Sequence, residues 1–229
     1  MRFASEGIGC GFTFFGNEEA AAETVRLASE AGPDAKIVPY RLRLSDASAV
    51  DTCVESAIDE FGDIGVLVNN AAIVRNNAAA IMTNEEWDEV IATNLSGPFY
   101  VSRSFLMHFL SNRFGRIINI SSLAQDGASG QVNYAASKAG LIGMTKTLAR
   151  EYGVKGITTN AVTVGLVETD MVKDSLAEQL RETWLTYCPM KRIGTADEIA
   201  SAVHYLTLPE SGFVNGEVLR IAGGLTYVP

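Results

Sequence analysis

Apolar and polar residues alternate along this chain in two periods, one typical of helices and one typical of buried strands. From residue 17 onward, stretches with apolar residues every three or four positions are separated by short runs rich in valine and isoleucine. Parallel strands need a crossover of a dozen or more residues between them, and a helix usually supplies it. The alternation therefore predicts an α/β fold, with a parallel sheet covered by helices on both faces.

The predicted elements follow from capping residues, helix breakers and β-rich runs. A helix capped by Ser45 or Asp46 ends near Phe61, and the other predicted helices cover residues 17–30, 84–110, 132–152, 173–186 and 195–206. Strands are predicted at residues 12–15, 36–40, 64–68, 116–120, 157–164 and 217–221. Gly97-Pro98 predicts a bend in the longest helix, and the continuous apolar run at 64–68 predicts a strand buried on both faces.

The composition narrows the class of protein. With 229 residues and 47% hydrophobic content, residues 1–229 are expected to form one well-buried domain. A net charge of −9 argues against a broad nucleic-acid surface. The chain has neither a membrane-length apolar run nor a signal-peptide layout, so a cytoplasmic protein without a membrane partner is expected. The scattered cysteines and histidines predict neither a disulfide framework nor a metal site.

Tyr134 and Lys138 form the most informative pair in the chain. They are four residues apart, and on a helix this spacing places two side chains on one face, about one turn from each other. A phenol with a pKa near 10 is a poor acid-base catalyst at neutral pH, but a neighbouring positive charge lowers that pKa. The pair therefore predicts a proton-transfer site in which Tyr134 donates a proton to a carbonyl oxygen.

The segment around this pair, above all residues 130–140 (GQVNYAASKAG), resembles the active site of the short-chain dehydrogenase/reductase family and its β-ketoacyl carrier-protein reductase branch. The resemblance implies that Tyr134 is the catalytic acid/base, and that Lys138 lowers its pKa and binds the nicotinamide ribose. It also implies a serine that hydrogen-bonds the substrate carbonyl. Ser122 matches that serine, with Ser121 as the alternative, because the interval to Tyr134 is one residue shorter than usual.

The family also uses an asparagine on an earlier helix to complete a proton relay. Asn94, in the segment ATNLSGPF, matches this position. A structural alternative is an asparagine that bonds to nearby backbone inside a helix.

The resemblance further implies a nicotinamide cofactor. Asn69-Asn70-Ala71-Ala72 follows a predicted strand and resembles the family's Asn-Asn-Ala-Gly wall, although a simple polar turn has the same composition. Val164-Gly165 matches the loop that covers the nicotinamide. The residues assigned to cofactor binding by the resemblance are Ser5, Gly7, Ile8, Asn70, Ala71, Ala72, Tyr134, Lys138, Gly165, Val167 and Thr169.

The amino-terminal part departs from the family pattern. Residues 4–9 resemble the end of the family's glycine-rich turn, yet Phe3 stands where the first glycine is expected. Only two residues separate Gly9 from the strand predicted at 12–15, which is too short for a helical crossover. We therefore expect a Rossmann-like, doubly wound parallel sheet whose N-terminal βα unit is truncated or degenerate.

Two function hypotheses follow from these features. The first is reduction of a ketone by NADPH, most simply a β-ketoacyl thioester, free or on an acyl carrier protein, in fatty acid or polyketide biosynthesis. NADPH is chosen from the branch resemblance and because no acidic residue ends the 12–15 strand to bind the ribose of NADH. NADH is the alternative, because Glu6 would repel the 2'-phosphate of NADPH. The second is a catalytically impaired, cofactor-poor subunit that pairs with an active reductase.

The resemblance also implies association with other chains. A homodimer or homotetramer is expected under the first hypothesis, and a hetero-oligomer under the second. Lys191 and Arg192 are either contacts for an acidic carrier protein or a solvated pair.

Overall fold

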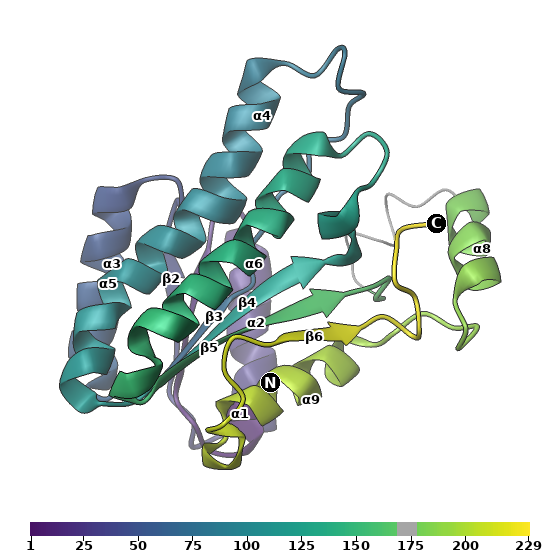
Figure 1. Ribbon diagram of the computed structural model, residues 1–229. Helices are drawn as coiled ribbons and strands as arrows, with labels where there is room; N and C mark the ends of the chain where they lie inside the picture. The colour runs from purple at the N-terminus through teal and green to yellow at the C-terminus, as the bar shows by residue number, and fades with distance from the viewer. Residues whose placement is uncertain (169–177) are drawn as a thin grey trace.

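The computed structural model describes residues 1–168 and 178–229, and it places parallel strands between helices on both sides (Figure 1). The strands are β1 (Cys10–Phe14), β2 (Ile37–Arg41), β3 (Val66–Asn69), β4 (Gly115–Ser122), β5 (Ile157–Val164) and β6 (Val218–Ile221). The α-helices are α1 (Arg2–Ser5), α2 (Glu18–Ala31), α3 (Ala47–Phe61), α4 (Asn84–Ile91), α5 (Gly97–Asn112), α6 (Val132–Tyr152), α8 (Glu178–Tyr187) and α9 (Ala196–Thr207). Shorter helical turns are η1 (Ala92–Ser96), η2 (Leu123–Asp126), η3 (Gly153–Lys155) and η4 (Pro209–Ser211). The predicted α/β class is confirmed.

Capping residues define where the helices begin. Asn17 accepts a hydrogen bond from the Ala20 amide ahead of α2, and Asp46 accepts from two amides ahead of α3. Thr83 and Thr195 form capping boxes at the starts of α4 and α9, because each is followed three residues later by a glutamate. The sequence prediction for the α2 cap is confirmed, and that for α3 is resolved in favour of Asp46.

A π-helical turn interrupts the long helix predicted at 84–110. Residues 92–96 form this turn between α4 and α5, and Pro98 lies in the first turn of α5, where its missing N–H breaks no helical hydrogen bond. The π turn carries Asn94, whose side chain is fully buried.

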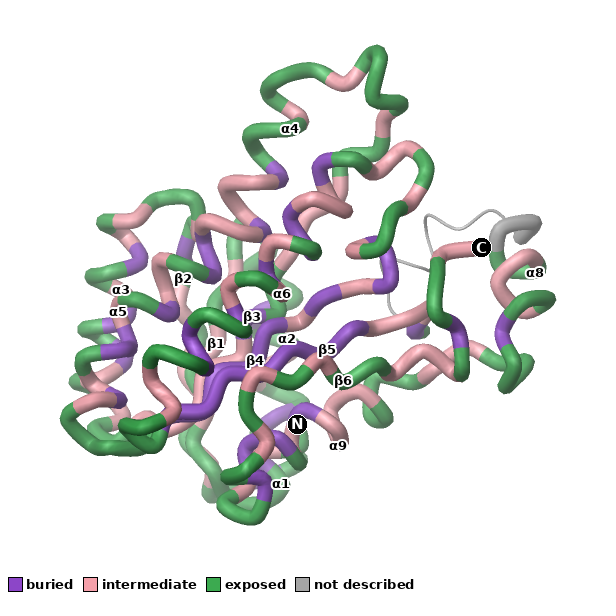
Figure 2. The backbone as a smooth tube through the Cα atoms, in the orientation of Figure 1, coloured by how far each residue is buried: buried purple, intermediate pink, exposed green. Residues whose placement is uncertain are grey.

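The main hydrophobic core lies between the sheet and helices α3, α5 and α6. Its centre includes the fully buried Phe109, Ile117 and Ile157, which come from α5, β4 and β5. Both central strands are buried along most of their length, as Figure 2 shows for β4 and β5.

The sheet is interrupted between β1 and β3. Strands β1 and β2 pair with each other, and β3, β4, β5 and β6 form a separate sheet in that order, with every pairing parallel. The Cys10 amide donates to Lys36 O, so the neighbouring Gly11 directs its amide away from β2. Likewise Arg116 N donates to Gly65 O, so Val66 directs its amide away from β4. In the described part of the chain, no strand pairs with either of these edges.

This interruption corresponds to the truncated N-terminal βα unit expected from the sequence, and it corrects one prediction. The strand predicted at 64–68 was expected to be buried on both faces, but Val66, Leu67 and Val68 are only partly buried. The expectation is wrong because β3 is an edge strand, paired only with β4. Among the described helices, none has the length and apolarity that crossing a membrane requires.

We predict that Phe109→Ala lowers the free energy of unfolding by about 3–5 kcal/mol, because it empties a fully buried site in the core. Urea denaturation measures this loss. Met107→Ala on the same helix is the matched control, since Met107 is 71% exposed, and it should change stability by no more than about 0.5 kcal/mol. Equal losses in the two variants would contradict this description of the core.

Candidate active site

Three parallel strands end at one edge of the sheet, and one of them carries Ser122 at its end. β3 ends at Asn69, β4 at Ser122 and β5 at Val164, and the register pairs Ser122 with Val164. Helix α6 begins beyond this edge and lies along β4 and β5 (Figure 1). The site therefore lies where ligands bind in open α/β sheets, outside the carboxyl ends of the strands.

Tyr134 and Lys138 lie on the same face of α6, as the spacing predicts. The Lys138 ammonium is 5.5 Å from the centroid of the Tyr134 ring. Lys138 is only 3% exposed, and its Nζ donates a hydrogen bond of 2.7 Å to the Ile120 carbonyl near the end of β4. A buried cation is thus held beneath the phenol.

The pKa shifts of this pair differ from the sequence-based expectation. Burial raises the pKa of Tyr134, and a hydrogen bond with the Ser122 side chain opposes that shift. Burial also lowers the pKa of Lys138 to about 8. The net decrease in the pKa of Tyr134 expected from the sequence is therefore not found in this structure, because burial disfavours the phenolate. At neutral pH, Tyr134 is a protonated phenol.

The two adjacent serines occupy different environments. Ser122 interacts with Tyr134 and also accepts a hydrogen bond of 3.2 Å from the Ala124 amide in η2. Ser121 is buried, and its hydroxyl lies 2.8 Å from Gln125 Oε1 and 3.0 Å from Lys138 O. Of the two candidates, Ser122 is the one that the structure places at the phenol.

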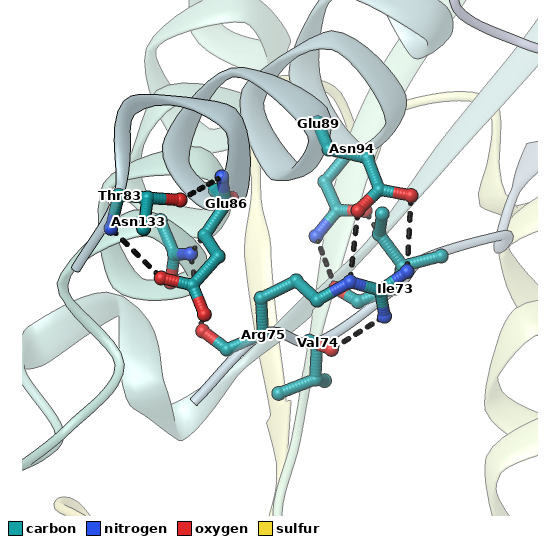
Figure 3. A network of polar contacts seen from close by, with 8 residues as sticks. All are labelled: Ile73, Val74, Arg75, Thr83, Glu86, Glu89, Asn94 and Asn133. Carbon is teal, nitrogen blue, oxygen red and sulfur yellow. Dashed lines mark hydrogen bonds and ion pairs between the residues drawn. The ribbon is translucent and has the colours of Figure 1, made fainter. Parts of the chain in front are cut away.

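Asn94 braces the loop that follows the Asn70–Ala72 motif. Its side-chain oxygen accepts from Ile73 N at 2.9 Å, and its amide nitrogen donates to Ile73 O at 2.9 Å (Figure 3). The same nitrogen lies 3.4 Å from Ser137 Oγ on α6. Ile73 lies in a loop 21 residues earlier in the chain, so these contacts differ from the local helix-backbone bonding of the structural alternative. The proton-relay role of Asn94 stays a prediction.

Several residues predicted to bind the cofactor also lie at the carboxyl edge. Asn70 and Ala71 are exposed just beyond β3, and Ala72 is half-buried. Gly165 donates its amide to Ile221 O, and a Cβ at this position would approach Ala222 Cα to 2.8 Å. Val167 forms a parallel bridge with Gly194. Thr169 lies outside the described residues.

Ser5, Gly7 and Ile8 lie at the opposite edge. In α1, the Ala4 carbonyl packs so closely on Gly32 that a Cβ there would collide with it, and the Glu6 carboxylate contacts His204 Nε2 at 2.8 Å. Gly32 follows α2 and His204 lies in the last turn of α9, and these helices lead to the starts of β2 and β6. Figure 1 shows α1 beside α9, away from the ends of β4 and β5.

The structure therefore fits a nicotinamide cofactor in part. The buried Lys138 ammonium, the exposed backbone at Asn70 and Ala71, and the tight approach at Gly165 suit the nicotinamide and ribose end. The residues expected at the pyrophosphate are not at this edge, so the residues present do not fit that end.

Sequence reasoning missed a buried polar ladder behind the site. Asn69 Nδ2 donates to Asn119 Oδ1 at 2.8 Å, and Asn119 Nδ2 donates to Thr145 Oγ1 at 2.8 Å, which ties β3 and β4 to α6. It also missed Asn133, which is fully buried next to Tyr134. Each of these predicted elements has an uncharged polar residue on its inner face. Because a buried amide requires hydrogen-bond partners, these residues were the signal from which the ladder could have been predicted.

A small cavity of about 120 Å³ lies between α8 and the segment after β6. Trp184, Cys188 and Leu225 line it, and these three residues also pack around Leu123, which directly follows Ser122. Part of its lining therefore packs on the turn that directly follows Ser122.

The lowered pKa of Lys138 predicts a pH dependence of stability. The unfolded chain holds this proton up to a pKa of roughly 10.4, whereas the folded protein releases it near pH 8. Between these values the unfolded state binds more protons, so stability rises with pH. Relative to Lys138→Met, the wild-type protein should gain roughly 2 kcal/mol between pH 7 and pH 10 in urea denaturation. Lys146→Met removes an exposed lysine of α6, and its stability should change with pH as that of the wild type does. A stability difference between wild type and Lys138→Met that does not change with pH would contradict the burial of Lys138.

Comparison with known proteins agrees with this arrangement. A family profile described as enoyl-(acyl carrier protein) reductase matches residues 1–226. The chain is 43% identical over 188 residues to the 3-oxoacyl-[acyl-carrier-protein] reductase FabG of Salmonella typhimurium, covering 82% of this chain and 77% of the relative. It is 40% identical over 227 residues to the protein of that name from Thermotoga maritima, covering 98% and 90%, respectively. The Staphylococcus aureus protein of that name is 37% identical over 226 residues, covering 98% and 91%. The chain therefore belongs to the short-chain dehydrogenase/reductase family of oxidoreductases.

Proposed function

We propose that this protein reduces a 3-oxoacyl thioester, presented by an acyl carrier protein, with NADPH as the reductant. The observation that carries the proposal is the placement of Tyr134 between Ser122 and the buried Lys138 at the carboxyl edge of the sheet. The names of the relatives from Salmonella typhimurium and Thermotoga maritima support the choice of substrate.

In the proposed reaction, Ser122 and Tyr134 both bind the substrate carbonyl oxygen. When bound, a reduced nicotinamide would be the source of the hydride that the carbonyl carbon accepts. Tyr134 gives its proton to the oxygen as negative charge develops there, which completes the alcohol and leaves a phenolate. Lys138 stabilises that phenolate by its charge, and a proton from solvent, passed along the groups near Asn94, restores the phenol.

The raised pKa of Tyr134 suits this direction of reaction. Burial keeps the phenol protonated at neutral pH, so the proton donor is in its active form before the substrate binds. Oxidation of the alcohol would require the phenolate instead.

The cofactor residues in this proposal are confined to the carboxyl edge. Lys138 would hold the nicotinamide ribose, and Asn70, Ala71 and Gly165 would form the wall and cover of the nicotinamide. Val167 and Thr169 are assigned to the same end by the family resemblance alone.

The cavity beside Leu123 suits the apolar tail of a short acyl chain. Its volume of about 120 Å³ is somewhat smaller than the engineered cavities of roughly 150 Å³ that hold a benzene molecule. The tail would enter while the carbonyl stays at Ser122.

Neither basic residue considered for carrier binding is free of an interaction within the chain. Arg192 is paired with the Glu198 carboxylate, whose pKa it lowers to about 2. The Lys191 ammonium donates to Thr186 O at 2.6 Å. A carrier protein would therefore have to compete with these contacts.

The impaired-subunit hypothesis is not supported by the comparisons, because the relatives named above are all reductases. The apolar face of α6 is also explained within the chain, since Leu141 and Leu148 are buried there and Met144 packs on the core. Homodimer or homotetramer formation and a cytoplasmic location remain part of the proposal.

We predict that Tyr134→Phe lowers kcat for acetoacetyl-thioester reduction by about 10²–10⁴-fold, because no other group replaces the proton donor. NADPH oxidation followed by absorbance measures this rate. Ser122→Ala should cost more activity than Ser121→Ala, since Ser122 is the serine that contacts the phenol. Unchanged turnover in Tyr134→Phe, or a larger loss in Ser121→Ala, would contradict the assigned roles.

A further inference from the structure

The start of the catalytic helix is anchored by a buried amide. Asn133 is fully buried, and its Oδ1 accepts a hydrogen bond of 2.7 Å from the backbone N–H of Tyr134. Gln131, the residue at the helix N-cap, makes no side-chain capping bond. Asn133 thus satisfies an amide in the first helical turn, where intrahelical partners are lacking.

The two donors of the same amide reach two other chain segments. Asn133 Nδ2 donates to Arg75 O at 3.1 Å and to Glu86 O at 3.1 Å. Arg75 lies in the loop that follows the Asn70–Ala72 wall, and Glu86 lies in the first turn of α4 (Figure 3). The three hydrogen bonds of the amide reach three different parts of the chain, and an alanine at this position makes none of them.

The loop that Asn133 holds is fixed from its other side as well. Asn94 binds both backbone groups of Ile73, and Asn77 N donates to Gly130 O at 2.9 Å. Glu86 is in turn held by the capping box with Thr83. The segment 73–77 is therefore a strip clamped between the π turn and the residues that lead into α6 (Figure 3).

We propose that Asn133 is a positioning residue that sets the place of Tyr134 relative to the nicotinamide wall. It does so by tying the Tyr134 amide to the 73–77 strip, which continues directly from Asn70–Ala72. The expected effect of Asn133 on turnover rests on the proposed function, whereas its expected effect on the start of α6 does not. A displacement of about 1 Å at a reacting group is enough to lower a rate about 10²-fold.

Asn133→Ala tests this role, with Thr83→Ala as the matched control. Thr83→Ala removes a hydrogen bond from the same network and loosens α4, but it leaves the contact to Tyr134 in place. Asn133→Ala should lower kcat by about 10–100-fold with KM for the acyl thioester changed less than about threefold, whereas Thr83→Ala should keep kcat within about twofold. If Asn133→Ala does not fold, Asn133→Ser, whose hydroxyl can still accept from the Tyr134 amide, should show a smaller loss in the same direction.

Amide hydrogen exchange separates this inference from the proposed function. The Tyr134 amide should exchange at least about tenfold faster in Asn133→Ala than in the wild type, and at the wild-type rate in Thr83→Ala. This result would support the positioning role even if the wild-type protein reduced no acyl thioester, an outcome that would overturn the proposed function alone. Unchanged exchange at Tyr134, unchanged kcat in Asn133→Ala with an active wild type, or equal effects in the two variants would overturn the inference.

Discussion

The parallel pairing of β4 with β5 is the constraint on which the rest of this structure depends. The two strands pair along their whole length, from Gly115 with Ile157 to Ser122 with Val164, and most of their residues are buried. Helix α6 packs across both strands, so the pairing determines where Tyr134 and Lys138 lie relative to Ser122. Lys138 donates to the Ile120 carbonyl of β4, so its ammonium stays buried only while β4 is paired with β5.

The interruption between β1 and β3 is compensated by helices. Leu42 after β2, together with Val50 and Val54 of α3, packs in the same core as Phe105 of α5. The two-stranded sheet is therefore joined to the four-stranded one through side chains, without strand pairing across the break. The apolar residues of β3 nevertheless stay partly exposed. The amino-terminal segment lies at the edge opposite the catalytic residues.

Much of the fold was predictable from the sequence because local signals agreed with the final packing. The bounds of α6 and β5 match the predicted 132–152 and 157–164, and β5 has a continuous β-rich run. The burial of β3 was not predictable from its own residues, because an apolar run has the same composition in a central strand and in an edge strand. The two kinds of strand differ only in whether a second strand pairs with them, and β3 has no second neighbour among the described residues.

In the site, too, features set by neighbouring residues were predictable from the sequence, and features set by distant residues were not. The spacing of Tyr134 and Lys138 predicted a shared helix face, and the structure has it. The direction of the Tyr134 pKa shift was not accessible, because it depends on burial by residues distant in sequence. Asn133 was missed for a related reason, since its partners Arg75 and Glu86 are far from it along the chain.

The central claim is that the carboxyl edge of β3, β4 and β5 forms a working nicotinamide site even though the amino-terminal segment lies at the opposite edge. Calorimetric titration of the full chain with NADPH and with NADH tests this most directly. We expect measurable binding of NADPH, and a loss of affinity of about tenfold or more in Lys138→Met, since the proposed function assigns the buried ammonium to the nicotinamide ribose. Failure of the wild-type protein to bind either nucleotide, or equal binding by wild type and Lys138→Met, would contradict it.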